Sequence, residues 1–143
     1  MAFALRLAAR AGRMGEVPVG AVVVDPAGRV IAAEHNRPIS ACDPTAHAEM
    51  LALRKAAAAM GNYRLVGCSV YVTLEPCPMC AGALCWARVE RVVFAAADPR
   101  WGAMGSVINI PAGPAVNHRP RVEGGLMSEE AARLLREFFA ARR

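Results

Sequence analysis

Apolar residues recur at helical spacing between arginines at the start of the chain, which predicts an amphipathic helix over residues 2–14. A run of β-branched residues follows and predicts a buried strand over residues 19–24. The next four residues, Asp25-Pro26-Ala27-Gly28, are a turn signal. We therefore expect residues 29–34 to return as the second strand of an antiparallel hairpin.

Strands and helices alternate along the rest of the chain. Asp43 and Pro44 suit the N-cap and first turn of a helix, and Gly61 suits its end. The other expected elements are a strand at 69–74, a helix from Pro76 to Arg88, a strand at 91–95, a loop at 98–120, an optional short strand and a last helix at 128–143. This order predicts an α/β fold, a three-layer α/β/α sandwich with a mixed central sheet whose later strands run parallel.

The length and composition fit one domain over residues 1–143. The chain has 143 residues, which is long enough to bury a sizeable core. Hydrophobic residues make up 55% and charged residues 20%, which excludes a disordered chain. No apolar run approaches the ~18 residues that a membrane span needs, and no secretion signal is recognisable. We therefore expect no membrane partner and a cytoplasmic protein.

Charge and cysteine content narrow the class of partner. The net charge of +5 permits an anionic partner such as nucleic acid, although a mildly basic enzyme surface explains it at least as well. The five cysteines are an odd number, and two of them lie three residues apart. In a reducing compartment this pattern favours metal binding or redox chemistry over a disulfide framework.

Two short motifs carry the candidate chemistry, His47-Ala48-Glu49 and Pro76-Cys77-Pro78-Met79-Cys80. Cys77 and Cys80 lie on one face at the start of a predicted helix, where free backbone N–H groups lower thiol pKa values. If the two helix starts face each other, His47, Cys77 and Cys80 supply three zinc ligands and leave the fourth tetrahedral position open. Glu49 would then accept and return the proton of an activated water.

Each part of this constellation has a simpler interpretation. A lone Cys-x-x-Cys in an α/β chain can be a thioredoxin-like redox pair, or half of a zinc ribbon that here lacks its second pair. His47 alone would be a structural histidine, and Glu49 alone a solvated helix residue. Both motifs together, in this order and at two predicted helix starts, are far more specific.

The combination matches the H-x-E…P-C-x-x-C signature of zinc deaminases that act on nucleobases. Over nearly its whole length the chain resembles the bacterial tRNA-specific adenosine deaminase family, which has the cytidine deaminase-like fold. The resemblance is carried by segments 16–21, 36–38, 43–49, 62–65, 71–77, 79–83, 91–94, 102–106 and 117–119. It implies a homodimer with one zinc per subunit and no organic cofactor. It also implies conversion of adenosine to inosine at wobble position 34 in the anticodon stem-loop of an arginine tRNA.

The resemblance also assigns residues. It makes His47, Cys77 and Cys80 the zinc ligands and Glu49 the proton shuttle, and Asn36 matches an asparagine that hydrogen-bonds the flipped base. Further candidates for contacts with the RNA are Asp98, after the strand at 91–95, and Arg142 and Arg143, at the chain end, with Arg100, Arg119 and Arg121 on or near the 98–120 loop. The chain departs from the family at Arg100-Trp101, where Lys-Thr or Lys-Ser is common, and at Trp86, where the residue is commonly smaller or polar.

Several hypotheses stay open at this point. The same chemistry on the same fold would deaminate a free base or nucleoside such as guanine, cytosine or cytidine. A non-catalytic zinc-stabilised RNA-binding module would not require Glu49, and a redox protein would keep its thiols free of metal. Trp101 either stacks on a base or covers the edge of the core. The helix around residues 79–88 is apolar on several sides, and we expect a second subunit to bury it.

Overall fold

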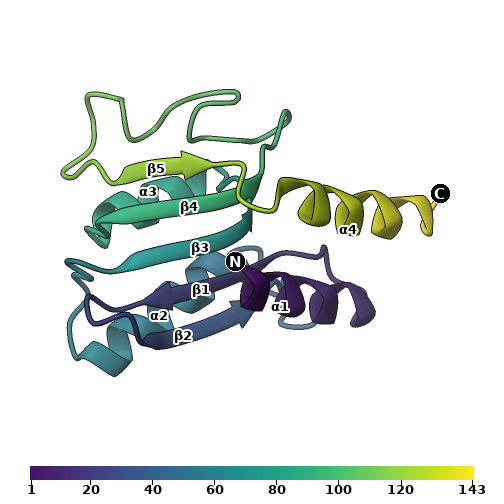
Figure 1. Cartoon of the computed structure of the whole chain (residues 1–143), viewed down its shortest axis with the longest axis horizontal. Helices are drawn as coiled ribbons and strands as arrows, with labels where there is room; N and C mark the ends of the chain where they lie inside the picture. The colour runs from purple at the N-terminus through teal and green to yellow at the C-terminus, as the bar shows by residue number, and fades with distance from the viewer.

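Five strands form one central sheet in the order β2-β1-β3-β4-β5 in the computed structural model, which describes residues 1–143 (Figure 1). The strands are β1 (Gly20–Val24), β2 (Val30–His35), β3 (Ser69–Leu74), β4 (Arg91–Ala96) and β5 (Arg121–Gly124). β1 is antiparallel to both β2 and β3, whereas β3, β4 and β5 run parallel. The predicted hairpin, the mixed sheet and the optional strand before the last helix are all confirmed.

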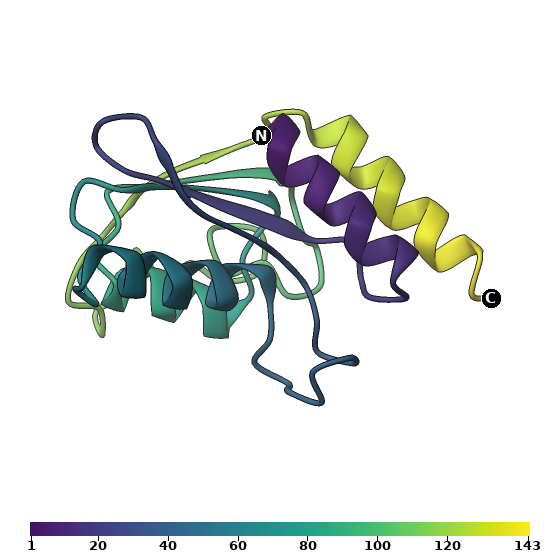
Figure 2. The ribbon, with the colours of Figure 1, turned by 90° about the horizontal axis from the view of Figure 1, so that it is seen from below.

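Four helices cover the sheet, α1 (Ala2–Arg13), α2 (Ala48–Met60), α3 (Pro78–Trp86) and α4 (Ser128–Ala140). α1 and α4 lie side by side on one face, and α2 and α3 lie on the other (Figure 2). This arrangement confirms the three-layer α/β/α sandwich. None of the four helices has the length and apolar character needed to cross a bilayer.

The main core lies between the sheet and the α2–α3 layer. β1 is buried along almost its whole length, as its unbroken apolar run predicts, because it is an inner strand with α1 on one face and α2 on the other. α2 turns Ala48, Ala52 and Ala56 toward the sheet at intervals of four residues, and all three are fully buried. Small side chains at these positions let α2 pack close to the sheet.

The start of α2 differs from the prediction. Asp43 and Pro44 do not open the helix, which begins at Ala48 with His47 as its N-cap. The Asp43 carboxylate instead accepts hydrogen bonds from the backbone N–H and the hydroxyl of Thr45, at 2.8 and 2.7 Å. These bonds close a local turn, which is the competing use of aspartate side chains. The end of α2 is as predicted, because Gly61 adopts a left-handed φ of 63°.

The other helix ends lie within a few residues of their expected positions. α3 ends at Trp86 and not at Arg88, because Arg88 adopts a left-handed φ of 56°. α4 ends at Ala140. It packs on α1 and projects beyond the C-terminal ends of β3 and β4 (Figure 1), so its last turns overhang the edge of the sheet where β3 leads into Cys77.

Candidate active site

Three metal-binding side chains meet where α2 and α3 begin. The Nδ1 atom of His47 lies 3.6 Å from the Sγ atom of Cys77 and 3.6 Å from that of Cys80. The three donor atoms all lie within 4.8 Å of one another. A tetrahedral zinc with Zn–N near ~2.05 Å and Zn–S near ~2.3 Å would separate nitrogen from sulfur by about 3.6 Å. The three residues therefore fit a zinc ion, with one coordination position left for a non-protein ligand.

Local backbone structure explains how these donors converge. His47 is the N-cap of α2 and Cys77 is the N-cap of α3, and both have extended backbone conformations. Cys80 follows Cys77 by one helical turn and is buried, so both thiols lie on the same side of α3. The predicted convergence of two helix starts is thus present, although His47 lies just outside its helix.

The polar environment favours a thiolate at Cys77. A hydrogen bond from Cys80, together with one from His47, lowers the pKa of the Cys77 thiol to about 4. The same Cys77–Cys80 bond and burial raise the pKa of Cys80. The hydrogen bond to Cys77 raises the pKa of His47. A thiolate beside two further donors at a helix N-terminus is a suitable ligand set for zinc.

Two of the donor residues, His47 and Cys77, line a cleft of about 740 Å³. Glu49, in the first turn of α2, also lines this cleft and is 4% exposed. Burial raises the pKa of its carboxyl to about 7. A buried carboxyl next to a metal site is the arrangement that proton transfer to and from a substrate requires.

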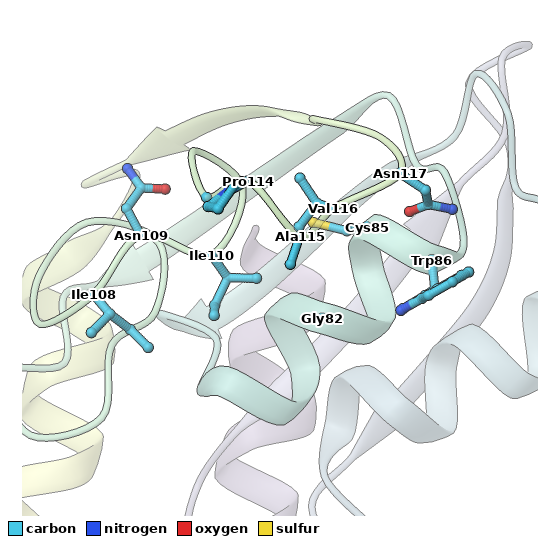
Figure 3. Close-up of a pocket in the computed structure, with 11 residues that line it drawn as sticks. Gly82, Cys85, Trp86, Ile108, Asn109, Ile110, Pro114, Ala115, Val116 and Asn117 are labelled. Atoms are coloured by element: carbon cyan, nitrogen blue, oxygen red, sulfur yellow. The ribbon is translucent and has the colours of Figure 1, made fainter.

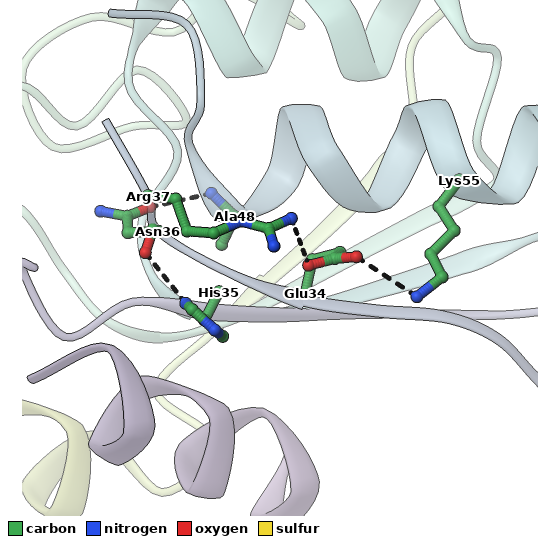
Figure 4. A network of polar contacts seen from close by, with 6 residues as sticks. All are labelled: Glu34, His35, Asn36, Arg37, Ala48 and Lys55. Atoms are coloured by element: carbon green, nitrogen blue, oxygen red, sulfur yellow. Dashed lines mark hydrogen bonds and ion pairs between the residues drawn. The ribbon is translucent and has the colours of Figure 1, made fainter. Parts of the chain in front are cut away.

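Asn36 lies at the same cleft and joins two elements (Figure 4). Its Oδ1 accepts a hydrogen bond of 2.8 Å from the backbone N–H of Ala48, the first residue of α2. Its own backbone N–H donates to Val19 O, and its carbonyl contacts His35 Nδ1 at 2.9 Å. Because the side-chain oxygen is occupied by α2, the amide NH₂ group is the part of Asn36 that a ligand in the cleft would meet.

The loop after β4 forms another wall of the cleft. Asp98 is part of this wall, but its carboxylate accepts the backbone N–H groups of Arg100 and Trp101 at 2.9 and 3.3 Å. Behind the loop, the buried Glu75 accepts hydrogen bonds from the backbone N–H groups of Asp98, Met104 and Ser106, each at 3.0 Å, and from the Ser106 hydroxyl. Hydrogen bonds outweigh burial here, and the pKa of Glu75 is lowered.

Of the basic candidates, only one lines the cleft; those at 119, 121, 142 and 143 do not. Arg100 lines it. Arg142 stacks on the ring of Phe138 with its guanidinium 3.5 Å from the ring centre, and Arg143 is exposed at the chain end. Arg119 donates to Gly113 O, and Arg121 pairs with Glu123 on β5, so these two do not line the cleft.

Three residues of the site were not singled out from the sequence. Leu135 and Phe139 of α4 line the cleft, but no local pattern signals that the last helix reaches it. Glu75 directly precedes the Pro-Cys-Pro-Met-Cys motif and lies in a segment that carries the family resemblance, but neither fact indicates its role. Its organising role depends on residues 23 to 31 positions away.

The two tryptophans lie in different hollows. Trp101 is 68% exposed and lines the cleft, so it does not cover the edge of the core. Trp86 is 66% exposed and lies at one end of a second hollow of about 270 Å³ beside α3 (Figure 3). Apolar residues of the long loop form the other side of this hollow: Ile108, Ile110, Pro114, Ala115 and Val116.

Comparisons with known proteins agree with this geometry. The family described as the cytidine and deoxycytidylate deaminase zinc-binding region matches residues 1–96. The tRNA-specific adenosine deaminase of Haemophilus influenzae is 47% identical over 143 residues, which is 100% of this chain and 83% of that protein. A solved structure from work on A-to-I editing by tRNA:A34 deaminases at the wobble position has a TM-score of 0.92 and 46% identity, covering 94% of this chain and 97% of the other. A guanine deaminase from Nitrosomonas europaea has a TM-score of 0.80 and 28% identity, covering 97% and 82%.

Proposed function

This chain belongs to the cytidine and deoxycytidylate deaminase zinc-binding family, in its branch of tRNA-specific adenosine deaminases, and we propose that it converts adenosine to inosine at wobble position 34 of a tRNA. The observation that carries this proposal is the buried Glu49 in one cleft with a three-donor zinc site. A redox dithiol would need no such carboxylate, and neither would a structural zinc. Residues 1–143 would act as one deaminase domain.

The reaction exchanges the 6-amino group of adenine for oxygen. Zinc held by His47, Cys77 and Cys80 would lower the pKa of a water at the open coordination position and so supply a nucleophile at neutral pH. We propose that Glu49 takes a proton from the attacking water and passes protons to the ring nitrogen and to the departing amine. Water is consumed and ammonia is released, so no oxidant or organic cofactor is required.

We assign recognition of the RNA to groups that line the cleft and to two arginines at the chain end, outside its lining. The amide NH₂ of Asn36 would donate to an acceptor atom of the flipped base. Asp98 and Arg100 line the path by which the strand would enter, and Arg142 and Arg143 would contact phosphates from the end of α4. The resemblance noted above supports the anticodon stem-loop of an arginine tRNA, in the cytoplasm, as the substrate.

We further propose that the chain acts as a homodimer. The support is the apolar hollow beside α3, where Trp86 is 66% exposed and Ile108 is 45% exposed (Figure 3). An exposed tryptophan and an isoleucine that share a hollow favour burial by a partner surface. A second copy of the chain would supply that surface.

The deciding experiment incubates the zinc-loaded protein with free nucleosides, free bases and an arginine anticodon stem-loop, and detects inosine and other products by mass spectrometry. We expect strong preference for the stem-loop, because flipping a base costs free energy that contacts to neighbouring nucleotides repay. Binding of the stem-loop should weaken with salt by a log–log slope of about −0.7 per phosphate contact. Equal turnover of free guanine or nucleosides, without salt dependence, would contradict the tRNA assignment and favour a free-base deaminase.

A further inference from the structure

Hydrogen bonds hold the backbone of the loop both before and after Trp101. Asp98 caps the N–H groups of Arg100 and Trp101, and Glu75 accepts from the backbone at Asp98, Met104 and Ser106. Gly102 is required at its position, because a Cβ atom there would lie 2.4 Å from Glu75 Oε2. The backbone beneath Trp101 is therefore fixed before any ligand binds.

This loop is also tied directly to the metal site. The backbone N–H of Ala103 donates to Pro76 O at 2.9 Å, and Pro76 directly precedes the ligand Cys77. The backbone that carries the indole of Trp101 thus has a defined position relative to the metal site.

The exposed indole of Trp101 has no aromatic or cation–π partner within the chain, whereas Phe139 packs edge-on against Phe138. Trp101 is 68% exposed, and Phe139 of α4, which lines the same cleft, is 44% exposed. The neighbouring side chain of Arg100 is exposed and forms neither an ion pair nor a hydrogen bond. An exposed indole on a fixed backbone, beside a free guanidinium and lining the proposed base-binding cleft, matches the way single-stranded nucleic acids are held by stacking.

We propose that Trp101 is a stacking surface for a nucleobase that neighbours the target adenosine, so that it selects a single-stranded substrate with an ordered flanking nucleotide. The proposal rests on the proposed function, because it presumes that a strand enters this cleft. Trp101 is a binding residue and takes no part in the chemical step. Its contribution is therefore expected in the capture of the RNA and not in the deamination of a base already bound.

The first test compares kcat/KM for the stem-loop among three variants. Trp101→Ala should lower it by about 5- to 150-fold, the loss expected for one base–aromatic stack. Trp101→Phe should restore most of the activity because it restores a ring. Tyr63→Ala is the matched control, because Tyr63 is 66% exposed beside Arg64 but does not line the cleft.

A second arm identifies the stacked base through a double-mutant cycle. Stem-loops with an abasic nucleotide on the 5′ or the 3′ side of the target are assayed with wild type and with Trp101→Ala. At the stacked position the abasic substitution should lower kcat/KM of the wild type but leave kcat/KM of Trp101→Ala almost unchanged. Independent, multiplying losses at both positions would overturn the proposal.

A third arm does not depend on turnover. In Glu49→Gln carrying Trp86→Phe, Trp101 is the only tryptophan, and titration with the stem-loop should quench its fluorescence to saturation. Unquenched emission together with full activity of Trp101→Ala would overturn the inference while leaving the proposed function intact. Failure of the wild type to deaminate the stem-loop would instead contradict the proposed function, and the quenching would still decide the role of Trp101.

Discussion

Two buried carboxylates line the cleft, and their partners give them different roles. Both oxygens of Glu75 accept hydrogen bonds from the 98–106 loop, so this side chain holds the wall of the cleft. Glu49 lies in the first turn of α2 beside the donor cluster, where burial raises its pKa to about 7. The proposed proton transfer therefore suits Glu49 and not Glu75.

Substitution of Glu49 should separate metal binding from catalysis. Glu49→Gln removes the proton acceptor but none of the three donors, so we expect about one zinc per chain with turnover lowered ~10²–10⁴-fold. Cys77→Ala should lose zinc as well as activity. Metal content by elemental analysis and inosine formation are the measurements, and full activity of Glu49→Gln would refute the mechanism.

A third carboxylate, Glu16, fixes the loop on the other side of the cleft. It is 1% exposed and accepts the backbone N–H groups of Ile39 and Ser40 at 3.2 and 2.7 Å. Burial alone would raise its pKa, but the hydrogen bonds from Ser40 and Ile39 prevail and lower it. The charged form is therefore favoured in the folded protein.

The pH dependence of stability follows from that direction. A carboxyl whose pKa is lower in the folded state stabilises the fold above its unfolded pKa, and this contribution is lost as pH falls through the folded pKa. Glu16→Gln should therefore lower the free energy of unfolding by about 1–3 kcal/mol at neutral pH. The difference from wild type should shrink in acid, below pH ~4. Urea titrations of both proteins at neutral pH and below pH ~4 measure this difference in the free energy of unfolding. A difference that grows in acid would contradict the stabilising role of the charged Glu16.

Among the elements, α2 shows how distant residues complete a helix end. Its N-terminal Ala48 N–H is satisfied by Asn36, which lies 12 residues earlier in the chain. The amide oxygen thus stabilises the helix, while the amide nitrogen is the group that we propose for the substrate. One side chain would then link the stability of α2 to recognition of the base.

Substitutions at Asn36 should divide these two roles. Asn36→Asp keeps an acceptor for the Ala48 N–H but removes the NH₂ donors, so it should fold with near wild-type stability and lose affinity for the stem-loop. Asn36→Ala removes both, and should also lower the free energy of unfolding by about 1 kcal/mol. Thermal unfolding and RNA binding, measured on both variants, test this; equal binding by Asn36→Asp and wild type would exclude the amide as a donor.

The same helix shows where prediction from sequence succeeds and where it stops. The strands and the crossovers follow from local periodicity, and the structure confirms them. It also brings together the side chains of His47, Cys77 and Cys80, which the two motifs predicted to meet. The start of α2 does not follow from local pattern. Asp43 forms hydrogen bonds with the nearby Thr45, and the first backbone N–H of the helix donates to the distant Asn36. The contribution of Phe139 to the cleft likewise depends on tertiary packing of α4, which no local pattern encodes.

At the scale of the whole molecule, the face beside α3 is the one that we propose joins two subunits. The hollow there brings together Trp86 and apolar residues of the long loop (Figure 3). Gly82 lies on the same face, and a Cβ atom at this position would meet no other atom within 4 Å. A side chain added at Gly82 would therefore disturb a partner and not the subunit itself.

Substitution of Gly82 tests the homodimer without disturbing the fold of the subunit. Gly82→Arg should sediment with the 15.2 kDa mass of one chain at micromolar concentration, while the wild type and Gly82→Ala sediment with twice that mass. Circular dichroism should show the same helix content in all three. A wild type that sediments as a single chain would refute the homodimer.

The fixed loop after β4 has a consequence for how this enzyme can change. Its backbone is held by Asp98, Glu75 and Gly102, while the side chains of Arg100 and Trp101 are exposed and form no hydrogen bonds within the chain. Substitutions at these two positions should leave folding unaffected, so new preferences for the bases around the target can arise there without the usual trade-off between stability and activity. Positions 100 and 101 therefore form a two-residue site at which substrate specificity can change, by natural or directed evolution, without a change in the stability of the fold.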